Sequence, residues 1–183
     1  PTVHISVGYP MADDLEFRAR RIRLLTLDVD GVLTDGRIYV DDHGREFKAY
    51  HVQDGLAMKM LQHAGIAVAW ITGSNAESVR HRAHLLGVHR VVLGAEHKTV
   101  PWQHLRAELG VEPAACAHMG DDLPDVPLLA ACGLAITVPH APDAVKRHAH
   151  YVTRRDGGAG AVREATELIL AAQARLAGAE AAH

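Results

Sequence analysis

An apolar segment runs into two closely spaced carboxylates in the stretch LLTLDVDGVLTDG, residues 24–36. Its first four residues, 24–27, predict a buried parallel strand, and the two glycines that follow indicate sharp turns. Asp28 and Asp30 are two residues apart, so their side chains project from the same side of an extended segment. No basic residue lies between them, and a cation is therefore needed to neutralise this corner. Ligands bind at this end of the strands in open α/β sheets, so the stretch predicts both a fold and the place of its site.

Length and composition are those of one α/β domain that can bury a core, with 183 residues and a formal net charge of -3 at pH 7. This charge gives no basic surface, and an aromatic content of 4% leaves few platforms for stacking bases, so we expect no nucleic-acid partner. Cys116 and Cys132 are isolated in apolar surroundings, as reduced core thiols are. The sequence has no signal-peptide pattern and no apolar run of membrane-spanning length, so we expect a cytoplasmic protein without a membrane partner.

Apolar runs alternate with helical patterns along most of the chain. We expect strands at 24–27, 66–71, 91–93, 116–119 and 134–137, with a short one near Tyr151. We expect helices from an Asp54 cap to Gly65, from an Asn75 cap to about Leu86, at 101–109, at 124–132 and at 143–147. Single helices between strands predict a Rossmann-like, doubly wound parallel sheet with right-handed crossovers.

Two segments stand apart from this alternation. Polar and apolar residues alternate on both sides of Asp41–Gly44, which predicts a β-hairpin inserted at about residues 37–50. A glycine-rich segment at about 157–164 precedes a long amphipathic helix, Ala161–Leu176, and its first residues are expected to form a flexible hinge. The predicted boundaries are 1–23 for an N-terminal extension, 24–176 for the main domain and 177–183 for a disordered C-terminus.

Polar groups follow four of the predicted strands, and a parallel sheet brings such strand ends together. They are Asp28 and Asp30, Thr72 and Gly73, Lys98, and Gly120 to Asp125. Several carboxylates with one lysine and one hydroxyl suit a hard cation with oxygen ligands, and Mg²⁺ is the usual choice beside a phosphate. We expect the metal ligands to be Asp28, Asp30 and Asp121, with Asp122 and Asp125 supporting the site.

The same residues can carry out phosphoryl transfer. With a metal ion screening the charge, Asp28 can attack phosphorus and form an aspartyl phosphate. Asp30 can protonate the leaving alkoxide and then accept a proton from water. Thr72 supplies a hydroxyl and Gly73 lets backbone amides approach the phosphate, while Lys98 places a positive charge at oxygens that gain charge in the transition state.

The order of these motifs resembles that of the haloacid dehalogenase superfamily of phosphohydrolases. Its first motif, Asp-x-Asp-Gly-x-x-Thr, matches Asp28 to Thr34, and the later motifs match Thr72, Lys98 and Gly120 to Asp125. More narrowly, the chain resembles the family of 3-deoxy-D-manno-octulosonate 8-phosphate phosphatases over about Leu24 to Gln173. The fragments that carry this narrower resemblance are Asp30–Gly36, the hairpin, Val52-x-Asp54-Gly55, Ile71–Gly73, Gly120–Asp122 and Gly157–Glu164.

This resemblance implies a Mg²⁺-dependent phosphatase without a cap domain, so that 24–176 would be a phosphatase domain of that superfamily. It implies hydrolysis of 3-deoxy-D-manno-octulosonate 8-phosphate, a sugar phosphate of lipopolysaccharide precursor synthesis. It also implies a homotetramer in which the hairpin and the glycine-rich tail of a neighbouring subunit close the site. The substrate-binding residues that it implies are Asp30, His51, Val52, Gln53, Asp54, Gly55, Lys59, Gly73, Ser74, Arg82 and Lys98.

Three positions depart from the family pattern, and two other functions remain open. Gln53, Ser74 and Ala159 stand where relatives often carry arginine, whose planar fork suits the carboxylate of an ulosonic acid. An alternative substrate is therefore a nine-carbon ulosonate 9-phosphate or another small phosphate ester. A phosphoryl-accepting receiver domain would use a similar acidic cluster, but it has no need for the acid and base chemistry that Asp30 offers.

Overall fold

The strand β1 (Leu24–Leu27) lies near the middle of a six-stranded sheet in the computed structural model, which describes residues 13–173. The strand order is β5-β4-β1-β6-β7-β8, and every neighbouring pair is parallel. The other strands are β4 (Ala67–Ile71), β5 (Arg90–Val92), β6 (Cys116–Met119), β7 (Leu134–Thr137) and β8 (Tyr151–Val152). The predicted doubly wound parallel sheet is confirmed, and β1, β6 and β7 have the predicted bounds.

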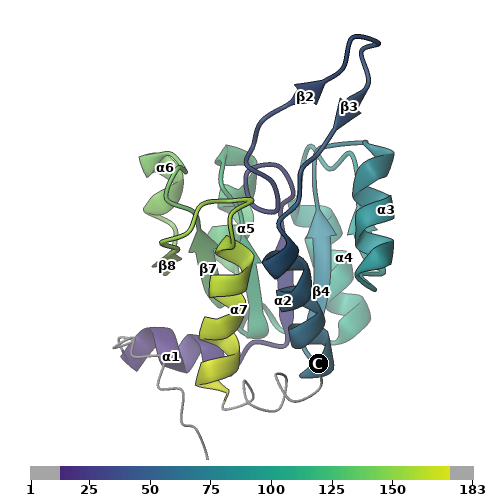
Figure 1. Ribbon diagram of the computed structural model, residues 1–183. Coiled ribbons are helices and arrows are strands. Elements are labelled where there is room, and N and C mark those ends of the chain that lie inside the picture. Colours follow the sequence, from purple (N-terminus) through teal and green to yellow (C-terminus); the bar gives the residue numbers. More distant parts are fainter. Residues whose placement is uncertain (1–12, 174–183) are drawn as a thin grey trace, which may run out of the picture.

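Helices cover the sheet on both sides (Figure 1). They are α1 (Asp13–Arg20), α2 (Val52–His63), α3 (Glu77–Leu85), α4 (Thr99–Leu109), α5 (Val126–Ala131), α6 (Asp143–Lys146) and α7 (Ala161–Ala172), with short 3₁₀ turns at Pro113–Ala115 and Leu123–Asp125. On one face α7 packs between α1 and α2, while α4 and α5 contact each other behind the sheet. No helix among residues 13–173 has the length and apolar character needed to cross a bilayer.

The core is built from the apolar runs that predicted the strands. All four residues of β1 are buried, and so is Trp70 at its place in the neighbouring β4. Burying one such large side chain stabilises the fold by about 1.5–3 kcal/mol, so continuous apolar runs favour central strands. Cys116 and Cys132 are buried and unpaired, as expected, and burial raises the pKa of their thiols to about 11 and about 12.

The predicted hairpin is present and projects away from the sheet (Figure 1). Its strands β2 (Tyr39–Val40) and β3 (Glu46–Phe47) pair antiparallel, and the rings of Tyr39 and Phe47 stack with centroids 5.5 Å apart. Asp41 Oδ1 accepts hydrogen bonds from the amides of His43 and Arg45, both at 2.9 Å, and fixes the turn. No second domain is inserted between residues 13 and 173, as expected for a chain without a cap domain.

Two predicted helix caps are wrong. The helix α2 begins two residues before Asp54, after His51, and its buried Asp54 accepts hydrogen bonds from the amides of Gly160 (3.2 Å) and Arg163 (2.8 Å). Asp54 therefore caps α7 rather than its own helix, since those amides are free donors in the first turn of α7. Similarly, α3 begins at Glu77, and Ser74 Oγ, not the Asn75 side chain, accepts the amide of Ala76 at 3.2 Å.

One end of the described chain contains a helix that the sequence analysis did not predict, and the other contains most of a predicted one. The N-terminal extension contains α1, whose Ala19 is fully buried; the helical spacing of Leu15, Ala19 and Ile22 was an available signal. At the other end, α7 ends at Ala172, and the rest of the predicted helix beyond 173, like the expected disorder at 177–183, lies outside the described residues.

The glycine-rich segment is packed and is not the flexible hinge that we predicted. Its Gly158 amide donates to Val32 O at 3.0 Å. A Cβ atom at Gly157 would lie 1.8 Å from Gly31 O, so only glycine allows the two backbones to approach this closely. The segment therefore presses directly on the loop that follows Asp30.

Candidate active site

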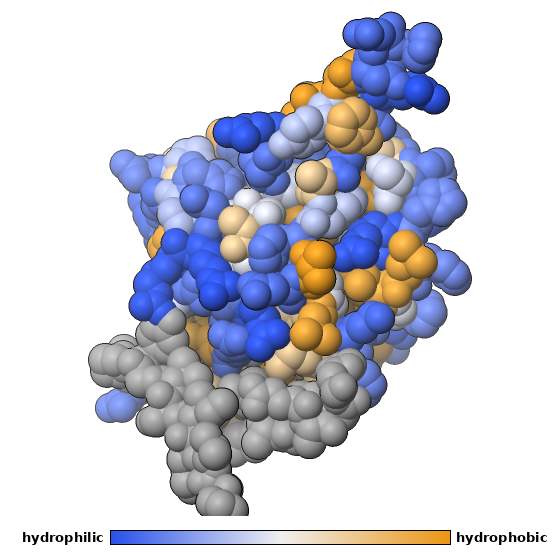
Figure 2. Space-filling view, in the orientation of Figure 1, coloured by the Kyte–Doolittle hydropathy of each residue, from blue (hydrophilic) through white to orange (hydrophobic). Residues whose placement is uncertain are grey.

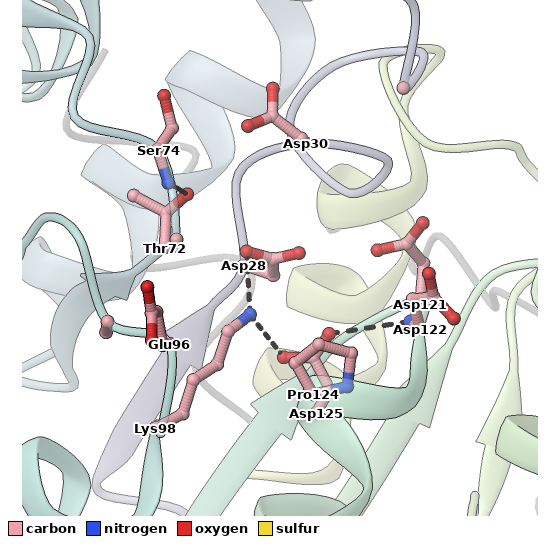
Figure 3. A pocket seen from close by; sticks show the side chains of 13 residues that line it. Asp28, Asp30, Thr72, Ser74, Glu96, Lys98, Asp121, Asp122, Pro124 and Asp125 are labelled. Carbon is pink, nitrogen blue, oxygen red and sulfur yellow. Dashed lines mark hydrogen bonds and ion pairs between the residues drawn. The ribbon is translucent and has the colours of Figure 1, made fainter.

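A pocket of about 460 Å³ opens at the carboxyl ends of β1, β4 and β6 (Figure 3). Its lining residues are Asp28, Asp30, Gly36, Thr72, Gly73, Ser74, Ala95, Glu96, Lys98, Asp121, Asp122, Pro124 and Asp125. The structure thus brings together side chains from all four predicted motifs. Glu96, which the sequence did not single out, stands beside them at the surface.

A buried chain of polar groups forms the floor of this pocket. Lys98 Nζ lies 2.8 Å from Asp28 Oδ1 and 2.7 Å from Asp125 Oδ1 (Figure 3). The same Asp125 oxygen lies 2.9 Å from His118 Nε2, and His118 Nδ1 lies 2.9 Å from Thr26 Oγ1. Because an ionised carboxylate can only accept, His118 Nε2 carries the proton in its contact with Asp125. Sequence reasoning missed His118, which looks like any other residue of a buried strand.

Negative charge is not balanced on this floor. Burial, with the charge of Asp125 adding to it, raises the pKa of Asp28 to about 6 against the opposing effect of Lys98. Burial and the nearby charges of Asp28 and Asp125 raise the pKa of Asp121 to about 8. Burial acts on Asp125 as well, but the hydrogen bond and charge of His118 and the charge of Lys98 outweigh it and lower its pKa. Lys98 alone therefore does not neutralise Asp28 and Asp121.

The donor set of the floor fits a divalent cation. Single oxygens of Asp28, Asp121 and Asp125 lie within 4.8 Å of one another. Lys98 and His118 already contact one Asp125 oxygen, which leaves Asp28 and Asp121 as the carboxylates whose charge most needs a counter-ion. An all-oxygen set of this kind suits Mg²⁺. The carboxylate of Asp30 is outside the cluster found among the described residues, so any ligand from Asp30 would have to be its backbone carbonyl.

Asp30 instead turns towards the hairpin. Its carboxylate lies at the mouth of the pocket, away from Asp28 (Figure 3), and its Oδ1 is 2.5 Å from Lys48 Nζ. Sequence reasoning missed Lys48, because a lone lysine in a hairpin usually reaches into solvent. The alternation in 46–50 was the available signal, since it places Lys48 and Tyr50 on the same side of the strand.

The remaining lining residues are fixed by short local hydrogen bonds. Thr72 is buried at the end of β4, and its Oγ1 accepts the amide of Ser74 at 3.1 Å. The hydroxyl of Thr72 is therefore free to donate its own hydrogen into the pocket. Asp122 Oδ1 accepts the amide of Leu123 at 2.7 Å and so shapes the loop that carries Asp121.

Several predicted substrate-binding residues do not line this pocket. They are His51, Val52, Gln53, Asp54, Gly55, Lys59 and Arg82. Gln53 Oε1 accepts a hydrogen bond from Arg155 Nη1 at 2.9 Å, and the Arg82 guanidinium lies over the Tyr50 ring, 5.8 Å from its centroid. Lys59 is two turns along α2 from the sheet's carboxyl edge and lines a separate hollow with His63 and His89.

The fold and this floor define a class: hydrolases with an α/β fold and a cluster of carboxylates at the carboxyl end of the central strand. The family model of haloacid dehalogenase-like hydrolases matches residues 51–133. A Yersinia pestis protein named 3-deoxy-D-manno-octulosonate 8-phosphate phosphatase KdsC is 45% identical over 97% of this chain and 96% of its own length. The corresponding phosphatase of Escherichia coli K12 is 41% identical over 91% of this chain and 89% of its own length.

Solved structures agree with the sequence relatives. The crystal structure of the Yersinia pestis phosphatase has a TM-score of 0.90 at 45% identity and covers 92% of this chain and 91% of its own. The Moraxella catarrhalis phosphatase, solved in complex with magnesium ion, phosphate ion and a KDO molecule, has a TM-score of 0.91 at 38% identity and covers 94% and 99%. The chain therefore belongs to the 3-deoxy-D-manno-octulosonate 8-phosphate phosphatase family of the haloacid dehalogenase-like hydrolases.

Proposed function

We propose that this chain is a Mg²⁺-dependent phosphomonoesterase that hydrolyses 3-deoxy-D-manno-octulosonate 8-phosphate to the free sugar acid and phosphate. We place this reaction in the cytoplasm, in the synthesis of lipopolysaccharide precursors. The observation that carries the chemistry is the Lys98 ammonium, held between Asp28 and Asp125 at the end of the central strand. The substrate rests on the named relatives at 41–45% identity.

Asp28 and Asp121 are the residues that would hold the metal, with Asp125 supporting them. Their raised pKa values mark carboxylates that lack a sufficient counter-charge within the protein. When bound, Mg²⁺ supplies positive charge that lets these carboxylates and a phosphate share the pocket. The magnesium and phosphate bound by the Moraxella catarrhalis relative support this assignment.

The chain's own residues then divide the reaction into two steps. An Asp28 carboxylate oxygen attacks phosphorus, the bond from phosphorus to the sugar oxygen breaks, and Asp30 gives that oxygen a proton. Water next attacks the aspartyl phosphate, Asp30 takes its proton, and the bond between phosphorus and Asp28 breaks. Lys98 and the Thr72 hydroxyl bind the phosphate oxygens, where charge develops in each transition state.

Recognition of the sugar acid is assigned to residues around the pocket mouth. Gly73 and Ser74 line the pocket. The predicted residues at 51–55, Lys59 and Arg82 lie outside it in a single chain, and we assign them to sugar contacts that form when subunits assemble. Arg82 has a buried Nε without a hydrogen-bond partner among the described residues, and such an atom suits a bound polar ligand.

We extend the proposal to a homotetramer in which the hairpin and glycine-rich tail of a neighbouring subunit close the site. The hairpin carries apolar side chains that stand in solvent in a single chain: Ile38 is 76% exposed and Phe47 55%. Figure 2 shows hydrophobic side chains along the hairpin and over α2. Exposed apolar side chains gathered on one element in this way are typical of protein interfaces. Light scattering of the purified chain tests the assembly, and a monomer in solution would contradict it.

A substrate panel tests the reaction. With Mg²⁺, we expect kcat/KM for 3-deoxy-D-manno-octulosonate 8-phosphate to exceed that for glucose 6-phosphate by about 100-fold or more, since a site that pairs with a substrate's polar groups rejects compounds lacking them. Equal values would contradict the proposed substrate and leave the phosphatase chemistry standing. The panel includes a nine-carbon ulosonate 9-phosphate, because Gln53, Ser74 and Ala159 depart from the family pattern. A higher kcat/KM for that ester would make it the substrate in place of 3-deoxy-D-manno-octulosonate 8-phosphate.

A further inference from the structure

The hairpin and the loop that carries Asp30 are joined by two polar contacts. Lys48, one residue after β3, places its Nζ 2.5 Å from Asp30 Oδ1. On the other arm, the hydroxyl of Tyr39 donates to Asp35 Oδ2 at 2.7 Å. Each arm of the hairpin therefore holds one carboxylate of the loop 30–36.

The Lys48 contact is the more enclosed of the two. The side chain of Lys48 is 11% exposed, and Asp30 is its ion-pair partner among residues 13–173. Removing an ammonium from water is costly unless an opposite charge compensates it, so this geometry needs Asp30. Asp30, at 40% exposure, faces the pocket on its other side.

The contact leaves the carboxylate free to exchange a proton. Lys48 reaches Oδ1, whereas Oδ2 of Asp30 has no hydrogen-bond or ion-pair partner among residues 13–173. A carboxylate with one oxygen fixed has a defined orientation, and its second oxygen can face the leaving group. Orientation of this kind matters, because a misplacement of about 1 Å can cost about 100-fold in rate.

We propose that Lys48 is a positioning residue that holds Asp30 in place for proton transfer and thereby makes this transfer depend on the hairpin. The inference rests on the proposed function, since it assigns Lys48 to the acid and base step of that reaction. Lys48 acts through Asp30 and is not among the residues that line the pocket.

Leaving groups of different basicity separate this role from a structural one. A sugar alkoxide needs a proton as it leaves, whereas p-nitrophenolate is stable without one. A defect in the orientation of Asp30 therefore slows the first step with a sugar phosphate and spares the first step with p-nitrophenyl phosphate. The second step, in which Asp30 takes a proton from water, is common to both substrates.

The experiment compares Lys48→Met and Lys48→Arg with the wild-type full chain and Mg²⁺. Single-turnover rates, with enzyme in excess, isolate the first step for each substrate. We expect Lys48→Met to lower the rate with 3-deoxy-D-manno-octulosonate 8-phosphate by about 10- to 100-fold, with little change for p-nitrophenyl phosphate and in KM. Lys48→Arg keeps the charge and should restore much of the rate.

A matched control removes another cation from a carboxylate pair. Arg90 contacts Glu108 Oε1 at 2.8 Å at the amino end of β5, opposite the pocket, and Arg90→Met should match the wild type with both substrates. If Lys48→Met does not fold, Lys48→Gln, which keeps a polar head group without charge, enters the same assay.

Three results would overturn the inference. Equal slowing of both first steps would indicate a structural role, a rise in KM with unchanged rate would indicate direct substrate binding, and unchanged kinetics would leave the ion pair without a role in the reaction. The proposed function fails separately, and does so if the wild type releases no phosphate or if Asp28→Asn remains active.

Discussion

The floor and the mouth of the pocket are built in different ways. On the floor, Asp28, Lys98, His118 and Asp125 are buried and follow or belong to strands of the sheet, and each side chain has a polar partner within 3 Å. At the mouth, Asp30 is partly exposed, and its partner comes from a hairpin that stands away from the sheet. The floor is thus fixed by the core, whereas the mouth depends on contacts with a hairpin outside the central sheet.

This difference separates the residues that act on phosphorus from the residues that recognise the substrate. Groups that act on phosphorus need fixed positions and little water, and strand ends supply both. Groups that recognise a sugar or admit it need access, which loops and hairpins supply. The following tests address the two regions in order of expected effect.

The largest effect is expected at the centre of the floor. Asp28→Asn keeps the shape of the side chain but removes the nucleophile, so kcat should fall by about 10⁴-fold or more. Phosphate release measures the loss, and circular dichroism confirms that the variant folds. Substantial turnover by a folded Asp28→Asn variant would show that another group attacks phosphorus.

Removing Asp125 should destabilise the protein more than removing an exposed carboxylate. Asp125→Ala leaves His118 Nε2 buried without its acceptor and Lys98 with Asp28 as its one remaining carboxylate among the described residues, and breaking a buried network of this kind costs up to about 3–5 kcal/mol. Urea unfolding measures the free energy of unfolding. Glu108→Ala, which breaks the exposed pair with Arg90, should cost about 1 kcal/mol or less. Equal losses for the two variants would show that the buried contacts of the floor contribute no more stability than an exposed ion pair.

Magnesium should stabilise the protein more at higher pH. The pKa values of Asp28 and Asp121 are about 6 and about 8 in the folded chain, above their ordinary value of 3.8, so without metal the folded state retains protons that the unfolded state has released. Stability without metal therefore falls between about pH 4 and about pH 8 through these groups, and Mg²⁺, which binds the deprotonated forms, reverses that loss.

Thermal unfolding with EDTA or Mg²⁺ at about pH 5 and about pH 8 measures this effect. At a hundredfold excess of Mg²⁺ over its Kd, the gain should approach about 2.7 kcal/mol at the higher pH. Asp121→Asn should abolish most of the gain. A gain that is the same at both pH values would indicate that these two carboxylates do not bind the metal.

A smaller effect than at the floor is expected at Asp54, outside the pocket. Asp54→Ala removes the cap of α7 and should cost about 1–2 kcal/mol in the free energy of unfolding. Asp54→Asn keeps one acceptor oxygen and should cost less. A large rise in KM with little loss of stability would instead assign Asp54 to substrate binding.

The sequence predicts the sheet and the floor well for a physical reason. The floor residues that the sequence predicted, Asp28, Lys98 and Asp125, each come after a strand, and parallel strands end at the same edge, so order along the chain gives proximity in space. His118 lies inside β6 and was missed because nothing in its strand marks it as part of the polar floor. The errors concern contacts between distant segments. Asp54 has the appearance of a cap for the helix that contains it, yet its hydrogen bonds go to Gly160 and Arg163, and no local pattern distinguishes the two.

The same limit explains why the sequence did not predict the contact made by Lys48 or the packing of the glycine-rich segment. Lys48 meets Asp30 because the second arm of the hairpin passes beside the loop as it returns towards α2, and the sequence does not give the angle at which a hairpin leaves a sheet. Gly157 has the composition of a hinge, but its lack of a side chain serves close packing on Gly31. A glycine that moves and a glycine that packs look alike in a single sequence.

The packing of the glycine-rich segment on the loop after Asp30 also sets the order in which the site can be completed. Asp28, Asp30, Thr72, Lys98 and Asp121 all precede Gly157 in the sequence, and so they leave the ribosome before it. The loop that carries Asp30 gains this packing partner only after all of these residues have been synthesised. A nascent chain that stops before Gly157 would hold every proposed catalytic side chain and still lack the backbone contact that supports the proton donor.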